Sequence, residues 1–446
     1  MSVHGPGPSS PDTRDTALIL AGRAWVRGRL EPMEIAIDQD GRIQSVGKIR
    51  SGAPRHDVGE SVILPAATDV HVHFREPGGP EEVENLATGT LQAALGGVTL
   101  VGDMPNNPYP ISDPERLEEK ARLVPGRAAV DVLLYASPFG AAHLERLARQ
   151  AGAFKLYLSP TTGISSVPGP SETDALLRRL ADFDLPLAVH AEDPAGFVEG
   201  EPPQDPRAWD RARPPAAEMQ AIDRLVAAPS RLRLHVAHVT TAAAARRIRA
   251  AGLSFEASPQ HLLLTKGSGS DPRFKVNPPL RSETEQRALW EAFRRGEVPI
   301  LASDHAPHSM EAKERTFDRA PSGMPGVETM LPLLLARVRA GELDLPTVIA
   351  AACDRPARWF GQPLGRIAPG HRANLIVIDF RARRPLSGRT LHAPCGWTAF
   401  EGMEAILPRE HYRDGERLVE AGEFVGSVRG RVVRPEYAAG PPGAGP

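Results

Sequence analysis

One pattern repeats along the chain between Ile63 and Leu301 and restricts the fold more than any other feature. A short aliphatic run, a break marked by glycine, proline or polar residues, and a longer stretch with helical spacing follow one another. Eight such runs can be counted, at residues 69–74, 97–104, 129–136, 153–159, 185–191, 232–239, 253–257 and 298–304. Eight alternating β/α units predict an α/β fold, a closed parallel (β/α)8 barrel of the TIM type, with an open doubly wound sheet as the alternative.

The two ends of the chain show a different pattern. Residues 17–49 and 365–434 read as short strands with turns, and Asp40-Gly41 is a hairpin signal. We therefore expect a small β-sandwich-like domain made from both chain ends, residues 15–62 plus 362–434, beside a barrel of residues 63–361. The Gly- and Pro-rich ends, residues 1–14 and 435–446, are typical of disordered tails.

Composition excludes several classes of partner. The chain carries 53 Lys and Arg against 55 Asp and Glu, a formal net charge of −2, so no overall field favours nucleic acid or an anionic membrane. No apolar run approaches the roughly 20 residues of a membrane helix, and no signal peptide is evident. The two cysteines, Cys353 and Cys395, cannot form a disulfide framework, which fits a reducing compartment. We therefore expect a cytoplasmic protein.

Polar side chains stand near the ends of five of the eight runs, where α/β barrels place their active sites. The first run contains His71-Val72-His73, and the two-residue period of a strand puts both imidazoles on one face. The other four runs contribute one residue each, namely Lys155, His190, His238 and Asp304. If the barrel closes, these six side chains converge at its mouth.

Four imidazoles and a carboxylate suit zinc, with manganese, cobalt or iron as less suitable alternatives. Lys155 differs, because an ammonium group is a poor neighbour for a divalent metal. A buried lysine with a depressed pKa can react with carbon dioxide to give a carbamate, an anionic ligand that could bridge two metals. Two such ions would lower the pKa of a shared water and polarise a carbonyl. These residues predict metal-assisted hydrolysis of an amide-like bond, with Asp304 moving the proton from water to the leaving nitrogen.

Eight motifs, in order along the chain, carry a resemblance to a known family. They are DVHVHFREPG (69–78), GGVTLVGDMPN (96–106), FKLYLSPTTG (154–163), VHAED (189–193), HVAHVTT (235–241), FKVNPPLR (274–281), ASDHAPH (302–308) and APSGMPGVET (320–329). With these motifs the chain resembles the dihydroorotases, a family of the amidohydrolase superfamily, from about residue 64 to residue 379. The resemblance implies a zinc-dependent cyclic amidohydrolase that interconverts N-carbamoyl-L-aspartate and (S)-dihydroorotate in de novo pyrimidine synthesis.

The resemblance also assigns roles to residues. It implies two Zn2+ ions, bridged by carboxylated Lys155, whose ligands match His71, His73, Lys155, His190, His238 and Asp304. Asp304 also matches the catalytic acid and base. Many bacterial members carry aspartate at the position of Lys155, and metal number varies among them, so the lysine favours two metals but leaves the occupancy of the second position open.

Other motif residues match contacts to the substrate. Arg75, Asn106 and His308 match the residues that hold its carboxylate, and Asn277 matches a contact to its ring. An arginine fork is well shaped for a carboxylate. Allantoinases and hydantoinases share the metal ligands but usually lack an arginine there, so Arg75 is the discriminating residue. Thr161 and Thr162 resemble hydroxyls that some members close over the substrate.

Two alternatives stay open at this point. One is an allantoinase or hydantoinase, which shares the chemistry, and the other is a catalytically silent structural homologue. Some family members associate with aspartate carbamoyltransferase, and we expect a homodimer with that enzyme as a further partner. For His235 and His305 a structural role is favoured, Glu192 and Asp193 read as loop or helix-end charges, and His261 reads equally well as a supporting or a plain loop residue.

Overall fold

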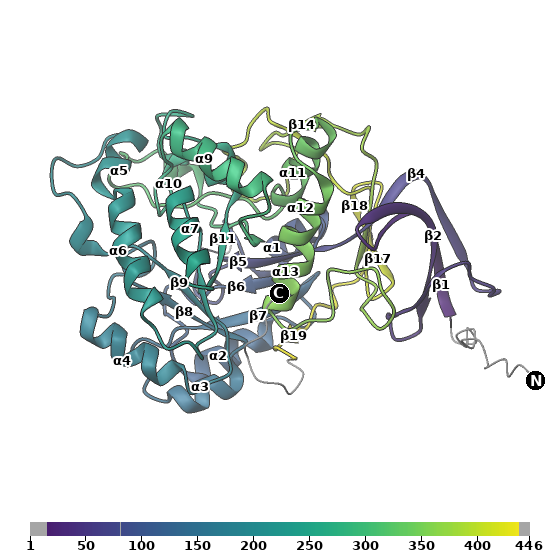
Figure 1. The fold of residues 1–446 in the computed structure, drawn as a ribbon, viewed down its shortest axis with the longest axis horizontal. Helices are drawn as coiled ribbons and strands as arrows, with labels where there is room; N and C mark the ends of the chain where they lie inside the picture. The colour runs from purple at the N-terminus through teal and green to yellow at the C-terminus, as the bar shows by residue number, and fades with distance from the viewer. Residues whose placement is uncertain (1–15, 81, 437–446) are drawn as a thin grey trace, which may run out of the picture.

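The computed structural model describes residues 16–80 and 82–436 and places a barrel beside a large antiparallel-rich sheet (Figure 1). The predicted tails therefore lie outside the described residues, apart from residues 435 and 436. None of the helices in the described part of the chain combines the length and the apolar character that a membrane span needs.

The barrel is built from eight parallel strands in sequential order, one at each predicted run, which confirms the predicted fold class. The strands are β5 (Ala67–Val72), β6 (Val98–Asp103), β7 (Asp131–Ala136), β8 (Ala153–Tyr157), β9 (Leu187–His190), β10 (Leu234–Val236), β11 (Ser254–Ala257) and β12 (Ile300–Leu301). Their residues are almost all buried, because side chains fill the interior and helices cover the outside. This explains why the sequence shows continuous aliphatic runs rather than alternation.

The barrel closes through loop residues. The last strand, β12, has only two residues, and the first and last strands meet just beyond them. Val72 forms a parallel bridge with His305, and the backbone N–H of His73 donates to the carbonyl of His305 at 2.8 Å. The seam of the barrel therefore lies among residues of the predicted site.

Helices follow the strands as predicted. They are α1 (Leu86–Leu95), α2 (Pro114–Leu123), α3 (Leu144–Gln150), α4 (Pro170–Leu180), α5 (Pro206–Ala212), α6 (Pro215–Val226), α7 (Ala242–Ala250), α8 (Pro259–Leu263), α9 (Glu283–Arg294), α10 (Met310–Lys313), α11 (Met330–Arg339), α12 (Leu345–Ile349) and α13 (Arg355–Trp359), with a π-helix at Ala350–Asp354 and short 3-10 turns at Pro194–Gly196 and Pro272–Phe274. Local sequence sets their ends: Asp113 caps α2 and is followed by Pro114, and Gly252 follows α7 with a φ of +70°.

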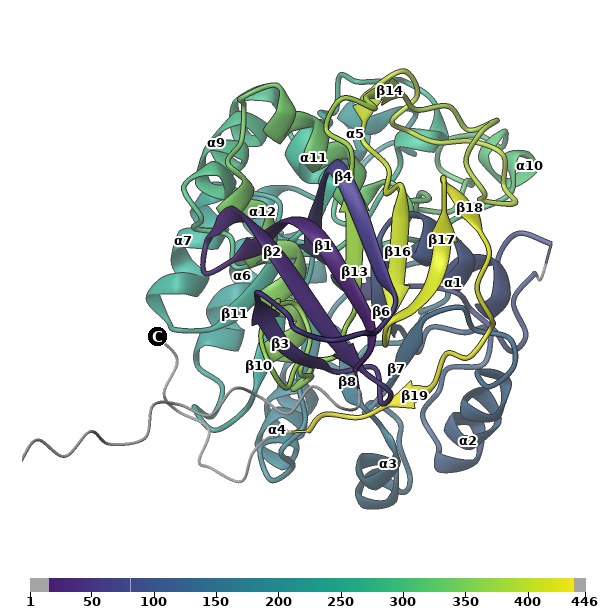
Figure 2. The same ribbon diagram turned by 90° about the vertical axis from the view of Figure 1, so that its right-hand side faces the viewer.

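The second sheet uses both chain ends (Figure 2). Its order is β18-β17-β16-β13-β4-β1-β2-β3, with β1 (Thr16–Val26), β2 (Arg29–Asp38), β3 (Ile43–Gly47), β4 (Arg55–Pro65), β13 (Leu375–Ile378), β16 (Glu410–Arg413), β17 (Glu416–Glu420) and β18 (Glu423–Phe424). Three two-residue strands complete the set: β14 (Arg384–Pro385) pairs with β15 (Glu404–Ala405), and β19 (Val432–Val433) pairs with β7 of the barrel. The hairpin predicted at Asp40-Gly41 joins β2 and β3, and Gly41 adopts a φ of +74°.

Strand β4 was not predicted, and it links the two ends of the chain. It pairs with β1 in parallel and with β13 in antiparallel, and two residues later the chain enters β5. The sheet and barrel are tied by buried polar contacts such as Asn374 Nδ2 to Thr99 Oγ1 at 2.6 Å. The division into domains at residues 15–62 plus 362–434 and 63–361 stays a prediction.

Candidate metal and active site

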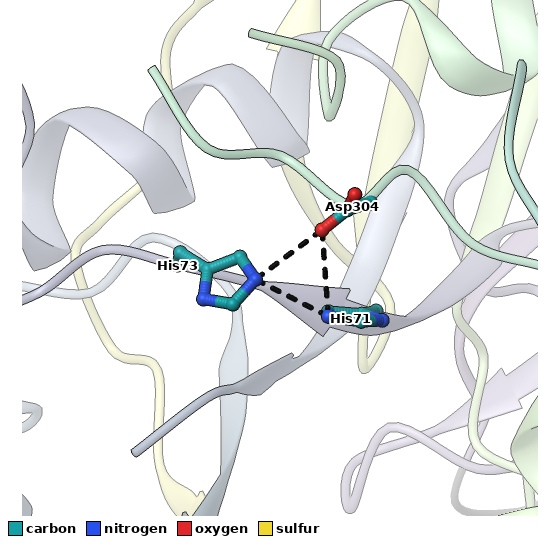
Figure 3. Close-up of side chains that lie close together, drawn as sticks. All are labelled: His71, His73 and Asp304. Atoms are coloured by element: carbon teal, nitrogen blue, oxygen red, sulfur yellow. Dashed lines mark hydrogen bonds and ion pairs between the residues drawn. The ribbon is translucent and has the colours of Figure 1, made fainter. Parts of the chain in front are cut away.

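His71, His73 and Asp304 meet at the mouth of the barrel (Figure 3). His71 lies on β5, His73 lies directly after this strand, and Asp304 follows β12. The Nε2 atoms of the two imidazoles are 3.2 Å apart, and Oδ1 of Asp304 lies 3.2 Å from Nε2 of His73 and 3.4 Å from Nε2 of His71. Three potential ligand atoms thus converge from the two sides of the barrel seam.

The structure brings the other three predicted ligands to the same place. Nζ of Lys155 lies 3.4 Å from Nε2 of His71, and Nδ1 of His190 lies 3.0 Å from Nε2 of His238. The ring centroids of His71 and His238 are 5.3 Å apart, which connects the two groups. Burial lowers the pKa of Lys155 to about 8. All six side chains predicted from the sequence therefore gather at one end of the barrel.

The imidazoles are oriented as a cation would require. Nδ1 of His71 faces the Oε1 atom of Glu256 at 2.5 Å, and Nδ1 of His73 faces Oδ1 of Asn106 at 2.5 Å. Because both partners are acceptors, each Nδ1 carries the hydrogen, and burial lowers the pKa of His73 to about 4, so this ring is neutral. Two Nε2 lone pairs and a carboxylate oxygen then face one another, an arrangement that a bound cation stabilises. The donor set therefore fits a divalent metal.

Glu256 on β11 holds several parts of the site, and sequence reasoning missed it. Besides His71, it accepts from Nε2 of His235 at 2.9 Å and from the backbone N–H of His238 at 3.3 Å. Although burial opposes its ionisation, His71 and His235 hold the pKa of Glu256 well below its usual range. The sequence did indicate such a role, because the carboxylate in the aliphatic run LSFEA can be buried only if other groups bond to it. The structural role predicted for His235 is confirmed.

Glu192 supports His190 in the same way. Its Oε2 atom lies 2.8 Å from Nε2 of His190, and Arg213 contacts both of its carboxylate oxygens, at 3.1 and 2.5 Å. This leaves Nδ1 of His190 to face His238. Glu192 lies in the loop after β9, as predicted, and it is fully buried, where it supports His190. Its position two residues after His190, on the same side of an extended segment, was the available clue.

Three residues of the site have left-handed backbone conformations. Arg75, His238 and Asp304 have φ values of +58°, +38° and +50°, and they make up half of the six non-glycine residues with positive φ in the described chain. Such conformations cost on the order of 1 kcal/mol each and persist where the surrounding structure enforces them. All three residues lie just beyond strand ends and line the cleft at the mouth of the barrel.

The predicted substrate contacts lie around a small cleft above these ligands. It is lined by His71, His73, Arg75, Asn106, Tyr157, Thr161, Thr162, His190, His238, Asn277, Asp304, Ala306, Ser322 and Gly323. Arg75 donates from Nη1 to the carbonyl of Pro307 at 2.7 Å, and its Nη2 lies 3.3 Å from Nε2 of His308, which stands behind it. Burial lowers the pKa of Arg75 to about 10, which leaves the guanidinium charged at neutral pH.

The loop after β8 forms part of the wall of the cleft through Thr161 and Thr162. Thr162 Oγ1 donates to the carbonyl of Ser322 at 3.0 Å, and Asn277 Nδ2 donates to Thr161 Oγ1 at 3.0 Å. Asn106 Nδ2 reaches the carbonyl of Thr162 at 3.2 Å. The cleft has a volume of about 30 Å³, room for about two water molecules. Thr161 and Thr162 thus form part of its wall and are bonded to residues of other segments.

Comparison with known proteins agrees with this geometry. The profile of the Amidohydrolase family matches residues 62–403. A dihydroorotase of Halobacterium salinarum is 35% identical over 412 residues, covering 90% of this chain and 96% of that protein. A dihydroorotase of Archaeoglobus fulgidus is 32% identical over 419 residues, covering 92% of this chain and 99% of that protein.

Solved structures show the same fold. An L-hydantoinase (dihydropyrimidinase) of Arthrobacter aurescens matches with a TM-score of 0.86 at 24% identity, over 94% of this chain and all of that one. A dihydropyrimidinase of Brevibacillus agri matches with a TM-score of 0.83 at 25% identity, over 95% of this chain and 99% of that one. Because the family profile spans most of the chain and relatives above 30% identity cover nearly all of it, the chain belongs to the amidohydrolase family and, within it, to the dihydroorotases.

Proposed function

We propose that this protein hydrolyses (S)-dihydroorotate reversibly to N-carbamoyl-L-aspartate and so serves pyrimidine synthesis. Relatives named dihydroorotase, similar over nearly their whole length, support this activity. The position of Arg75 carries the proposal, because a charged guanidinium in the wall of the cleft that His71 and His73 also line suits a cyclic substrate bearing a carboxylate. Hydantoinases are similar at about 24% identity, which supports the shared fold alone.

The donor set supports two zinc ions as the cofactors. Their proposed ligands are His71, His73, Lys155, His190, His238 and Asp304, with a carboxylated Lys155 as the bridge. With its pKa near 8, roughly a tenth of the Lys155 amine is neutral at pH 7, and this form can attack carbon dioxide and lose a proton to give the carbamate. Bound metal would supply a Lewis acid that polarises the ring carbonyl and acidifies the attacking water.

Asp304 is the proposed acid and base. Although burial opposes ionisation, the pKa of Asp304 lies below its usual range with the charge of Lys155 nearby, so its carboxylate is ionised at neutral pH and can accept a proton. In the hydrolytic direction Oδ1 or Oδ2 takes a proton from the attacking water and gives it to the ring nitrogen that leaves. In the biosynthetic direction the same transfers run in reverse.

The remaining cleft residues bind and enclose the ring. We propose that Arg75, Asn106 and His308 hold the substrate carboxylate and that Asn277 contacts the ring. In the present conformation Asn106 bonds to His73 and Thr162, and Asn277 bonds to Thr161, so their amides are already directed at the cleft or its lid. Closure of the Thr161–Thr162 loop would exclude bulk water during the reaction.

The decisive experiment joins metal analysis with an assay. The protein is purified without chelator, its zinc content is measured, and hydrolysis of dihydroorotate, hydantoin and allantoin is compared. We expect about two metals per chain and the highest kcat/KM on dihydroorotate. Faster turnover of a ring without a carboxylate would favour a hydantoinase or allantoinase, and a metal-free, inactive protein would favour a silent homologue.

Location and assembly are further proposals. Cys353 and Cys395 are both free, which supports a reducing compartment such as the cytoplasm. A homodimer and an association with aspartate carbamoyltransferase stay predictions, and sedimentation of the protein alone and mixed with that enzyme tests both.

A further inference from the structure

The hydroxyl group of Tyr157 makes no hydrogen bond that would give it a structural role in the described protein. Tyr157 is the last residue of β8, its side chain is only 5% exposed, and its oxygen has no hydrogen-bond partner among the described residues. Most buried side-chain polar atoms in proteins have such a partner, because leaving one unpaired costs stability. Among the buried tyrosines of the described residues, Tyr157 alone has an unpaired hydroxyl, and this needs an explanation.

The other buried tyrosines of the described chain are satisfied. Tyr135 on the neighbouring strand β7 donates from its hydroxyl to the carbonyl of Val70 at 3.1 Å. Tyr412 in the second sheet donates to a carboxylate oxygen of Glu410 at 2.7 Å. The fold thus pairs buried tyrosine hydroxyls where they have a structural role, and Tyr157 departs from this rule.

Its position places Tyr157 in the catalytic cleft. Tyr157 stands two residues after Lys155 on the same strand, and side chains at this spacing point to the same face. Nζ of Lys155 lies 5.4 Å from the centroid of the tyrosine ring, and the ring centroid of His190 lies at 6.1 Å. The side chain lines the cleft together with Arg75 and Asp304. The ring therefore packs beside the proposed metal ligands, and the side chain forms part of the wall of the proposed substrate cleft.

We propose that the hydroxyl of Tyr157 donates a hydrogen bond to an oxygen atom of the bound ring substrate. The inference rests on the proposed amidohydrolase function and adds a residue to it. A phenol is neutral at pH 7 and offers one O–H donor, so it can pair with a carbonyl or carboxylate oxygen without competing for the metal as a carboxylate would. In the free enzyme this hydroxyl stays unpaired, which costs stability but keeps the donor available for the substrate.

Two matched variants test this. Tyr157→Phe removes the orphaned hydroxyl from the cleft, and Tyr135→Phe removes a paired hydroxyl from the adjacent strand. Both holoenzymes are assayed for kcat and KM on dihydroorotate, for metal content and for Tm. We expect kcat/KM of Tyr157→Phe to fall about 10- to 100-fold, with metal content unchanged and Tm unchanged or raised. Tyr135→Phe should show the opposite pattern, with a lower Tm and kcat/KM within about twofold of wild type.

The kinetic constants then identify the contact. A fall in kcat alone places the bond on the oxygen that gains charge in the transition state, and a rise in KM alone places it on an oxygen contacted equally in both states. An unchanged kcat/KM for Tyr157→Phe would overturn the inference, and so would a loss of metal, which would assign the hydroxyl to Lys155 instead. If the wild type acts on hydantoin and not on dihydroorotate, the proposed function fails, and the same two variants are compared on hydantoin.

Discussion

Nδ1 of His71 and Oε1 of Glu256 lie 2.5 Å apart, so the first strand of the barrel is bonded to the seventh directly behind a proposed metal ligand. This contact fixes which nitrogen of His71 carries the hydrogen and leaves Nε2 free to coordinate. Because Glu256 also accepts from His235 and from the backbone of His238, one carboxylate positions both sides of the site.

Replacing Glu256 by Gln tests this positioning role. The amide can still accept one hydrogen bond but no longer supplies the negative charge that makes His71 a stronger ligand. We expect metal affinity to fall about 10- to 100-fold, measured by competition with a chelator. Glu218→Gln is the matched control, since this buried carboxyl on α6 bonds to Thr240 and its pKa is raised to about 7 by burial. If both variants bind metal like wild type, Glu256 has no role in coordination.

Asp304→Asn tests the proposed proton transfer. The amide keeps the size of the side chain but cannot accept a proton, so we expect kcat to fall about 100- to 10,000-fold. Metal content is measured in parallel, because the same oxygen faces His71 and His73. Asp193→Asn is the control, since this carboxylate caps the short turn at Pro194–Gly196 outside the cleft. Substantial turnover by a metal-loaded Asp304→Asn variant would assign the proton transfer to another group.

Arg75→Ala tests the nature of the substrate. Loss of the guanidinium removes a charge-assisted contact to the carboxylate, so KM for dihydroorotate should rise about 10- to 100-fold while kcat changes less. Any slow hydrolysis of hydantoin, which has no carboxylate, should be unaffected. Normal dihydroorotate kinetics in this variant would show that Arg75 does not recognise the carboxylate.

Thr162→Val tests the lid. The change keeps the shape of the side chain and removes the hydroxyl that bonds to both the carbonyl and the N–H of Ser322. We expect the closed loop to be less populated, with KM raised several-fold and faster proteolysis within residues 161–166. Ser165→Ala, an exposed position in the same loop, serves as the control. Equal protease sensitivity of the two variants would mean that the Thr162 contacts do not hold the loop.

The sequence predicted the barrel because its signal is local. Each strand is an aliphatic run buried on both faces, and each helix begins and ends at residues with clear preferences, such as Asp113 and Gly252. The sequence also predicted that the six proposed metal ligands gather, because the carboxyl ends of all strands in one barrel lie at the same rim. Strand β4 was missed, because only its second half is a buried aliphatic run and its first half is largely exposed.

The supporting residues were harder to predict because their roles depend on distant partners. Glu256 lies 185 residues from His71, and the sequence around Glu256 does not indicate that its partner is this imidazole. Glu192 lies only two residues after His190 in sequence, but its burial depends on Arg213, which comes from a later segment. The conformation of the Thr161–Thr162 loop depends likewise on Ser322 and Asn277. Contacts of this kind are fixed only once the barrel has closed.

The seam between β5 and β12 has a consequence for stability. The first and last strands are joined there by one bridge, by the bond from His73 to His305 and by bonds from Ser303 to Asp69 and His71, and His73 and Asp304 stand on opposite edges of this seam. A cation coordinated by both residues would cross-link the two edges of the seam. It would add to the stability of the folded state by mass action. Stripping it with a chelator should lower the melting temperature and speed amide hydrogen exchange first around residues 72–74 and 303–306. The same ion would then determine both the thermal stability of the protein and the readiness of its active site for catalysis.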